Sequence, residues 1–241
     1  DRRGLFCIFT GEKMNKFDID NYCVIKQAMD PLICDFAFKY FQNKSKVSKW
    51  LWDNKKIETD YWGFFFDDQA DGAFSNYSDI VMETLLQSCT KTIEKKINKK
   101  LVPNYSYARL YIKGNVLKRH KDRFACEIST TMNLGGDEWA IYIEPDKNIG
   151  GYKHEGDYMI YHRGESKGVK IMLKPGDMMV YRGDLCEHWR KKFTGDICGQ
   201  VFFHYNHEDT EGAKENKYDG RPMLGLARSY CNLESNQHNR R

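Results

Sequence analysis

The stretch VKIMLKPGDMMVY (residues 169–181) decides the fold class of this chain. Two short apolar runs flank Lys174-Pro175-Gly176-Asp177, which is a strong turn signal. Short runs with a proline only at their boundary are typical of antiparallel strands joined by a tight connection. We therefore predict a strand on each side of this turn.

The same pattern recurs on both sides of that stretch and predicts a core rich in strands. No alternation of strand, helix and strand occurs, which argues against a doubly wound parallel sheet. A series of short strands with turn residues between them favours a jelly roll, or double-stranded β-helix, over residues 101–210. The further predicted strands are Tyr105–Ile112, Cys126–Leu134, Trp139–Ile143 and Gly199–Tyr205.

The first hundred residues are predicted to be mostly helical. Asp30-Pro31 combines an N-cap with a proline at the first helical position, and a second helix should begin near Ser78-Asp79. We expect residues 1–100 to form supporting helices packed on the barrel, and residues 211–241 a polar C-terminal tail. The result would be one compact α+β domain. The first helix should bury Ile33, Phe36, Ala37, Tyr40 and Phe41, and the second Val81, Leu85, Cys89, Ile93 and Ile97.

Composition narrows the classes of function. The chain has 241 residues, of which 41% are hydrophobic, so it can bury a sizeable core. Its net charge of +4, from 38 Lys and Arg against 34 Asp and Glu, is too mild to predict a nucleic-acid or membrane partner. No run approaches the ~18–20 apolar residues of a membrane span. The eight cysteines contain no C-x-x-C pair and favour reduced thiols in a cytoplasmic protein.

The sequence lacks several standard motifs. It has no phosphate-binding P-loop, no dinucleotide-binding glycine pattern and no H-E-x-x-H zinc motif. One G-x-S-x-G occurs at Gly164–Gly168, but a polar stretch precedes it and a strand is predicted after it. A serine nucleophile of that type needs the strand before it and a helix after it. We interpret the segment as a loop.

His120-Lys121-Asp122 and His188 remain as candidates for chemistry. On an extended backbone, residues i and i+2 point to the same face, so His120 and Asp122 can present an imidazole and a carboxylate to one point. Two histidines and one carboxylate form the facial triad that suits non-haem Fe(II), because it leaves adjacent metal positions open. The plainer alternatives are a surface His–Asp pair and a core histidine bonded to a backbone carbonyl. The other histidines are expected to be solvated (His154, His162) or structural (His204, His207).

Residues 103–206 resemble the 2-oxoglutarate- and Fe(II)-dependent oxygenases of the prolyl 4-hydroxylase-like type. The most specific parts of the resemblance are Tyr111 with the H-x-D at His120, the KPGDMMVY run (residues 174–181), HWR (residues 188–190) and QVFFHY (residues 200–205). The helical first part is also similar to the support helices of such enzymes.

The resemblance implies a cofactor set and a reaction. Fe(II) would be held by His120, Asp122 and His188, with 2-oxoglutarate and O₂ as co-substrates and ascorbate as an optional addition. The reaction would be hydroxylation of an unactivated C–H bond, for which a peptidyl proline is one target. Tyr111 would hydrogen-bond the co-substrate carboxylate.

The chain departs from the family where the distal carboxylate of 2-oxoglutarate needs a cation. The family usually carries Lys or Arg about ten residues beyond the distal histidine, and here that position is Cys198. Arg190 is our first candidate to replace it, because it follows His188 by two residues on a predicted strand over residues 186–193 and its planar fork suits a carboxylate. Further candidates are Lys192 and Arg109 for this anchor, and Asn133 and Gln200 as polar residues lining the pocket.

Several functions stay open at this level. A jelly-roll module could retain the metal ligands without turnover, and the missing cation near Cys198 favours that reading. A hydroxylase of a free amino acid or small metabolite is another alternative, and a zinc hydrolase is a weaker one. The partner would accordingly be a protein, a peptide or a small molecule, with contacts expected from the aromatic segment 61–66 and the loop 150–164. The sequence does not indicate an oligomeric state.

Overall fold

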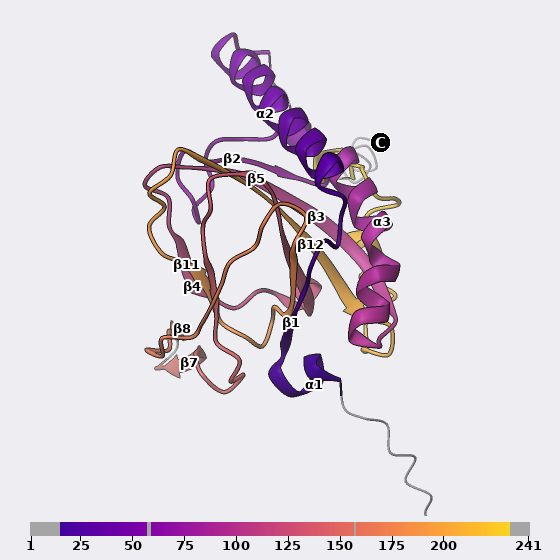
Figure 1. The fold of residues 1–241 in the computed structure, drawn as a ribbon, viewed down its shortest axis with the longest axis vertical. Coiled ribbons are helices and arrows are strands. Elements are labelled where there is room, and N and C mark those ends of the chain that lie inside the picture. Colours follow the sequence, from indigo (N-terminus) through magenta and orange to yellow (C-terminus); the bar gives the residue numbers. More distant parts are fainter. Residues whose placement is uncertain (1–14, 57–58, 157, 232–241) are drawn as a thin grey trace, which may run out of the picture.

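The computed structural model describes residues 15–56, 59–156 and 158–231. Two antiparallel sheets face each other as a double-stranded β-helix, and helices cover the outside of one of them (Figure 1). The α+β fold with a jelly-roll core that the sequence predicts is therefore confirmed.

A six-stranded sheet forms one wall of the barrel. Its strands follow the order β1-β10-β5-β12-β3-β2, and each neighbouring pair is antiparallel. The long strands β3 and β12 pair along their whole length and form the centre of this sheet. The members are β1 (Tyr22–Ile25), β2 (Phe74–Tyr77), β3 (Leu101–Ile112), β5 (Ile128–Gly136), β10 (Met178–Arg182) and β12 (Ile197–His207).

A four-stranded sheet forms the opposite wall, in the order β4-β11-β6-β9. Strand β11 lies between β4 and β6 and is antiparallel to both. Since β4 ends at His120 and β11 begins at His188, both histidines lie at one end of this wall. The members are β4 (Leu117–His120), β6 (Ile141–Ile143), β9 (Val169–Ile171) and β11 (His188–Arg190).

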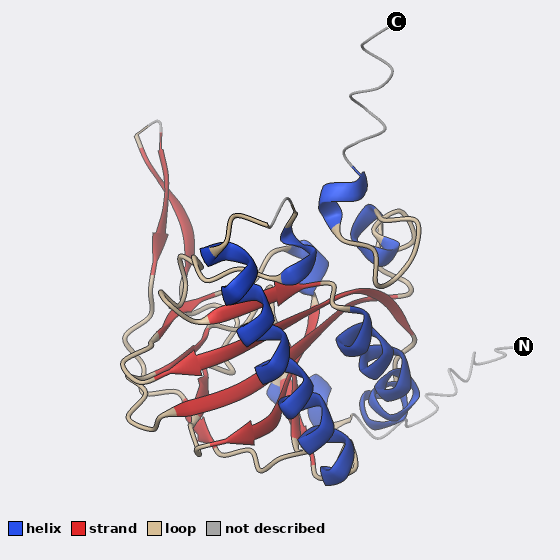
Figure 2. Ribbon diagram, turned by 90° about the horizontal axis from the view of Figure 1, so that it is seen from above, coloured by secondary structure: helices blue, strands red, loops and turns tan. Residues whose placement is uncertain are grey.

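Two long helices, α2 (Pro31–Asp53) and α3 (Ile80–Ile97), cross the outer face of the six-stranded sheet (Figure 2). Asp30 and Asp79 cap them, and each side chain accepts a backbone N–H of the first turn, as the sequence predicts. Successive side chains of β12 point alternately to the two faces of the sheet. Val201 and Phe203 face the apolar cluster under the helices, whereas Cys198 and Phe202 belong to a cluster inside the barrel.

The support region is mostly helical, as the sequence predicts, but two details differ. The short strands β1 and β2 also lie within residues 1–100 and extend the larger sheet. In α2, Ala37 and Phe41 are buried as predicted, but Ile33 and Phe36 are exposed, and Cys34 belongs to the buried face. Apolar side chains occur around much of this helix, so the sequence alone does not decide which face is buried. Packing against the sheet selects a face shifted by one residue from the predicted one.

The segment 150–164 differs from the predicted loop, because most of it forms a β-hairpin. Its strands β7 (Gly151–Glu155) and β8 (Tyr158–His162) form a two-stranded sheet that projects from the body (Figure 2). The aromatic segment 61–66, from which substrate contacts are expected, is partly exposed. The short helix η1 (Asp60–Trp62) begins it, and Phe66 is 66% exposed.

The last described part of the chain packs back on the core. It contains the short helices η3 (Lys217–Gly220) and α4 (Arg228–Cys231), and a further short helix, η2 (Phe124–Cys126), lies between β4 and β5. The buried Arg221 forms an ion pair of 2.7 Å with Glu83 of α3. The predicted polar tail thus begins with ordered contacts, and its residues 232–241 lie outside the described ranges. A helix α1 (Lys16–Asp20) precedes β1.

Two further observations concern the whole described chain. Its helices are all too short or too polar to cross a membrane. Its seven described cysteines are free thiols, in agreement with the expected reduced state, and Cys7 lies outside the described ranges.

Candidate metal centre

His120, Asp122 and His188 converge on one point inside the barrel. His120 and His188 are direct partners across β4 and β11, with ring centroids 4.3 Å apart. The Oδ1 atom of Asp122 lies 3.4 Å from His120 Nε2 and 3.5 Å from His188 Nε2. The three donor atoms lie within 4.8 Å of one another, as a metal site requires.

Backbone carbonyls fix the orientation of both imidazoles. His120 Nδ1 lies 2.7 Å from the carbonyl oxygen of Lys118, and His188 Nδ1 lies 3.1 Å from that of Cys186. A carbonyl can only accept, so each Nδ1 must carry the proton. In the neutral rings, both Nε2 lone pairs are then free and face Asp122, the arrangement that metal-ligating histidines adopt.

Asp122 is held from the opposite side. The hydroxyl of Ser129 donates to its Oδ2 at 2.9 Å, and its own backbone N–H donates to the Gly183 carbonyl at 2.8 Å. Burial opposes the charge of this carboxyl, but His188 and His120 hold its pKa well below the ordinary value. Burial also opposes the charge of His120, but the hydrogen bond with Asp122 outweighs it and raises the pKa of that imidazole. The carboxylate is therefore ionised and ready to bind a cation.

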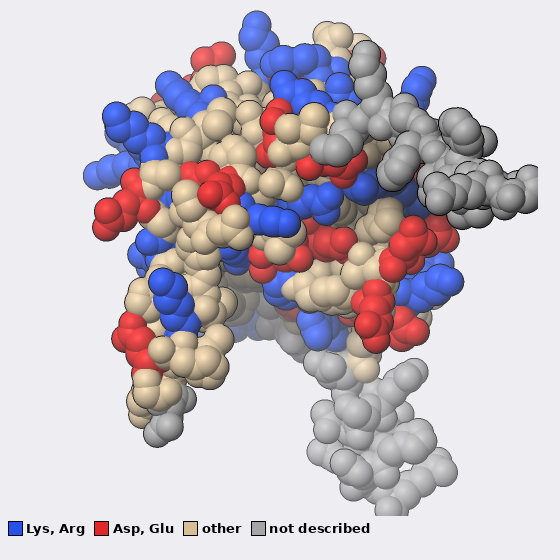
Figure 3. Space-filling view, turned by 90° about the horizontal axis from the view of Figure 1, so that it is seen from below, with Lys and Arg blue, Asp and Glu red and all other residues tan. Residues whose placement is uncertain are grey.

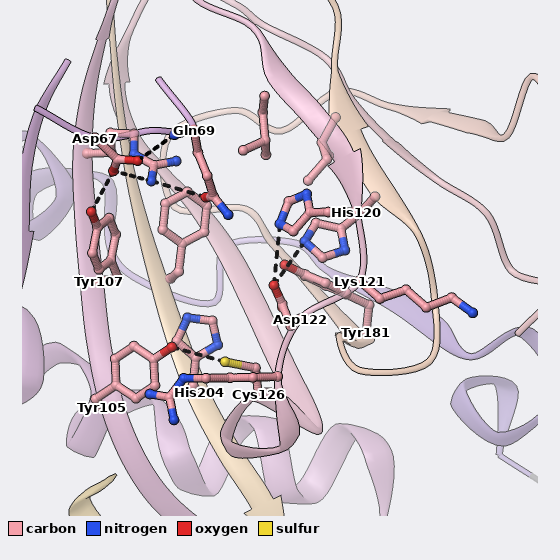
Figure 4. A pocket seen from close by; sticks show the side chains of 16 residues that line it. Asp67, Gln69, Tyr105, Tyr107, His120, Lys121, Asp122, Cys126, Tyr181 and His204 are labelled. Atoms are coloured by element: carbon pink, nitrogen blue, oxygen red, sulfur yellow. Dashed lines mark hydrogen bonds and ion pairs between the residues drawn. The ribbon is translucent and has the colours of Figure 1, made fainter. Parts of the chain in front are cut away.

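The triad opens into a pocket of about 390 Å³ between the sheets (Figure 4). Both histidines and Asp122 face it from one side, which leaves their common point accessible to a ligand. Two nitrogens and one carboxylate oxygen on one side of an open pocket fit an octahedral metal such as Fe(II) with adjacent free positions. The other lining residues are Asp67, Gln69, Tyr105, Tyr107, Arg109, Leu117, Lys121, Arg123, Cys126, Ile141, Tyr181, Phe202 and His204.

Arg190 is a buried cation inside the barrel. It is 1% exposed, and burial lowers its pKa. Its guanidinium donates to Thr131 Oγ1 at 3.3 Å, to Gln200 Oε1 at 3.1 Å and to the Trp139 carbonyl, while its Nε has no partner. Within the described parts of the chain, no carboxylate forms an ion pair with it.

The other candidate cations are placed differently. Arg109 lines the pocket but pairs with Asp67, and its Nη1 donates to the Tyr111 hydroxyl at 2.8 Å. Lys192 is exposed to solvent, because β11 ends at Arg190 and the predicted strand over residues 186–193 does not extend to it. The structure thus brings Arg190, Arg109 and Tyr111 into the barrel and leaves Lys192 outside.

Sequence reasoning missed part of the pocket. His204, expected to be only structural, lines the pocket, as do Cys126, Asp67 and Gln69 (Figure 4). Alternation along β12 could have identified His204, because it follows Gln200 by four residues and shares its inward face. Asp67 and Gln69 come from an irregular loop, and no sequence pattern indicates where such a loop passes.

Comparisons with known proteins support the fold. No family model matches the chain, and no curated protein matches it. Among solved structures, it is similar to a Pseudomonas putida prolyl-4-hydroxylase, with 11% identity and a TM-score of 0.51 over 80% of this chain and 95% of that one. A Trichoplax adhaerens prolyl hydroxylase, solved with a hypoxia-inducible-factor peptide, gives 11% and 0.52 over 80% and 86%.

A third similar structure is HygX from Streptomyces hygroscopicus with nickel and 2-oxoglutarate bound. It gives 12% identity and a TM-score of 0.52 over 80% of this chain and 85% of that one. Identities this low bear on the fold alone. The chain has the fold of the prolyl 4-hydroxylase-like 2-oxoglutarate/Fe(II) oxygenases, which confirms the fold resemblance predicted from its sequence.

Proposed function

We propose that this chain is a 2-oxoglutarate- and Fe(II)-dependent dioxygenase that hydroxylates an unactivated C–H bond. The observation that carries the proposal is the convergence of His120 Nε2, His188 Nε2 and Asp122 Oδ1 on one accessible point in a pocket. Fe(II) bound there would supply the oxidation by O₂, coupled to decarboxylation of 2-oxoglutarate to succinate and CO₂. The nickel and 2-oxoglutarate in HygX support this cofactor set.

Arg190 is the proposed anchor for the distal carboxylate of 2-oxoglutarate. A buried guanidinium without a counter-ion is unfavourable, and an entering carboxylate would remove that cost. Arg109 lacks this property because Asp67 already neutralises it. Gln200 and Thr131 orient the Arg190 fork, and the position of the usual family cation, Cys198, faces Arg190 from β12.

Tyr111 and Trp139, which lie next to Arg190 and behind the residues that line the pocket, would position the co-substrate and limit access of water. The Tyr111 hydroxyl accepts from Arg109 and keeps its own hydrogen free to donate to a carboxylate. Tyr111 also packs edge-on against Trp139, which lies under the Arg190 guanidinium. These aromatic side chains make the inner end of the barrel apolar around the proposed ion pair, and a low local dielectric strengthens that pair.

An anaerobic titration tests the cofactor assignment. Protein loaded with Fe(II) is titrated with 2-oxoglutarate while the visible metal-to-ligand charge-transfer band is recorded. We expect a band in the wild type, none in His188→Ala, and on the order of tenfold or more 2-oxoglutarate needed in Arg190→Met, as for loss of a charged hydrogen bond. Lys192→Met is the matched control and should titrate like the wild type.

The alternative outcomes are equally specific. Iron binding without any band would exclude 2-oxoglutarate as a ligand and favour a metal-binding jelly-roll module. A band with wild-type affinity in Arg190→Met, in a protein whose circular dichroism is unchanged, would move the anchor to Arg109.

A polypeptide is the substrate class that the surroundings of the pocket favour. The β7–β8 hairpin exposes four large side chains, and Figure 3 shows it as a projecting lobe covered largely by uncharged residues. Its base is bound by Lys121, whose Nζ donates to the carbonyls of Lys147 and Gly150 at 2.9 Å. Lys121 stands between two triad residues, so the hairpin flanks the pocket. The four exposed residues are Tyr152, Tyr158, Met159 and Ile160.

A prolyl residue within such a segment is the proposed target, supported by the peptide complex of the Trichoplax enzyme. Synthetic proline-containing peptides would be screened for stimulated succinate formation. With an active peptide, Tyr158→Ser combined with Ile160→Ser should raise the KM for peptide several-fold and leave 2-oxoglutarate binding unchanged. Stimulation only by small metabolites, or an unchanged peptide KM, would favour a small-molecule hydroxylase.

A further inference from the structure

A second group of metal-binding side chains lies beside the triad and shares Asp122 with it. Cys126 Sγ, a nitrogen of His204 and a carboxylate oxygen of Asp122 lie within 4.8 Å of one another. Cys126 belongs to η2 and His204 to β12, so three separate segments meet here. All three residues line the same pocket as the triad (Figure 4).

Hydrogen bonds hold these residues in place around the shared carboxylate. The Ser129 hydroxyl oxygen lies 2.9 Å from Asp122 Oδ2 and 3.0 Å from His204 Nδ1. When Ser129 donates its single hydrogen to Asp122, Nδ1 of His204 must donate to Ser129, and Nε2 keeps its lone pair. Tyr105 contacts both Cys126 and His204, with its hydroxyl 3.0 Å from Cys126 Sγ and its ring centroid 4.5 Å from that of His204.

The chemistry of this set differs from that of the triad. Two nitrogens and one oxygen suit iron, whereas the sulfur in the second set favours a softer cation such as zinc, or cobalt as its substitute. We propose that Asp122, Cys126 and His204 form a second site, for a thiophilic divalent cation such as Zn²⁺. Binding would release the thiol proton of Cys126 to solvent and form a metal–sulfur bond, with no change of oxidation state.

Because both sites share the Asp122 carboxylate, a cation at the second site would affect metal binding at the triad. A cation at Cys126 and His204 draws Asp122 toward itself and away from the two triad histidines. Zinc would therefore weaken iron binding at the triad. This consequence rests on the proposed function, whereas the proposal of the second site does not depend on it. The predicted outcome is an enzyme that zinc inhibits through Cys126 at concentrations at which a Cys126→Ser variant is resistant.

Cobalt titration of the full chain under anaerobic conditions tests the site directly. A thiolate ligand produces a near-ultraviolet sulfur-to-cobalt charge-transfer band, which the triad residues cannot give. At saturating Co²⁺ we expect two equivalents to bind to the wild type, the second more weakly because both sites share Asp122, with the thiolate band appearing. Cys126→Ser should bind one equivalent without the band. His204→Asn should weaken the thiolate-bearing step by at least the roughly 10–100-fold typical of lost outer-shell partners.

The control is Cys231→Ser, because Cys231 is a partly exposed thiol of the described chain and lies outside the pocket. It should behave like the wild type. A wild type without the thiolate band, or a band of equal intensity in Cys126→Ser, would overturn the second site. The readout is independent of 2-oxoglutarate, so failure here leaves the iron titration above unaffected. Melting temperatures of each variant confirm that folding is retained.

Discussion

Arg119 and Glu187 form a buried ion pair on the outer face of the smaller sheet, with 2.5 Å between Arg119 Nε and Glu187 Oε2. Each directly precedes one of the triad histidines, so the pair ties β4 to β11 on the side opposite the metal centre. Glu187 also accepts hydrogen bonds from the Tyr161 hydroxyl at 2.9 Å and from the Gly164 N–H. One carboxylate therefore connects the hairpin to the strands that carry both histidines.

Glu187→Gln should weaken both the fold and the metal centre. Removing one charge leaves Arg119 with only the Glu144 carboxylate, 3.8 Å away, as a counter-ion, which costs about 1–3 kcal/mol of unfolding free energy. Metal affinity should fall by roughly 10–100-fold, as for other residues that position ligands. Urea unfolding and Fe(II) or Co²⁺ titration measure the two effects. Glu165→Gln, on the exposed part of the same connection, should change neither.

Asp184 predicts a pH dependence of stability. Burial, together with the nearby Glu127 carboxylate, raises its pKa to about 6 from the ordinary 3.8, and its Oδ1 has no partner. The folded protein binds this proton more tightly than the unfolded chain, so stability is gained below the folded pKa and lost as the pH rises through it. At neutral and higher pH the ionised group is therefore destabilising.

Asp184→Asn should raise the unfolding free energy at pH 8 by on the order of 1–2 kcal/mol, after allowing for partial solvent screening. The gain should shrink as the pH is lowered and vanish near pH 4, where the wild-type carboxyl is protonated in the folded state. Urea denaturation at several pH values provides the measurement. A gain that is independent of pH would assign the effect to packing instead of charge.

Patterns that repeat along the chain made the barrel predictable. The Pro-Gly turn at residues 174–177 and the period-two alternation of β12 mark strands, and the caps at Asp30 and Asp79 mark the helix starts. The H-x-D and His188 could be placed together because sheet pairing brings a strand end and a strand start to one edge. The turn, the alternation and the caps are local signals, and the meeting of the two histidines follows from the jelly-roll topology.

The features that the sequence did not predict depend on contacts between segments distant in the chain. The hairpin over residues 150–164 has a weak strand pattern, and the exposed Ile33 and Phe36 differ from their buried neighbours only by which side meets the sheet. The counter-ion of Arg109 is Asp67, which reaches the pocket from a loop forty-two residues earlier. No periodicity indicates such a meeting, so the sequence alone could not show that Arg109 already has a counter-ion.

Arg221 should be essential for seating the last described segment on the core. Its guanidinium pairs with Glu83, 1% exposed, and also donates to the Asn104 and Leu226 carbonyls at 3.0 and 2.9 Å. Arg221→Met leaves Glu83 buried without its partner and should cost about 3–5 kcal/mol. Hydrogen exchange of residues 217–231 should rise well before global unfolding.

The control for that variant is Arg228→Met, since Arg228 reaches Asp219 at 3.5 Å with a side chain that is 60% exposed. An exposed pair of this kind contributes about 0–1 kcal/mol. Equal losses in the two variants would show that the segment is not held by the buried pair.

Gly183 tests how rigidly the backbone fixes Asp122. A Cβ at this position would collide with Ser129 Oγ, Asp122 Oδ2 and the Cys126 carbonyl, all of which belong to the support of the metal centre. The carbonyl cannot move freely, so Gly183→Ala must displace Asp122 or Ser129. We expect metal affinity to drop by on the order of tenfold or more, with about 1–3 kcal/mol lost from overpacking.

Gly114→Ala separates this effect from backbone strain. Gly114 has a φ of +95°, and a Cβ added there would meet nothing within 4 Å, so alanine costs only conformational strain of about 1 kcal/mol. Metal titration should be unchanged in that variant. If Gly183→Ala also bound metal like the wild type, Asp122 would be positioned by the metal itself and not by the packing around it, and the clamp from Ser129 and Gly183 would be dispensable.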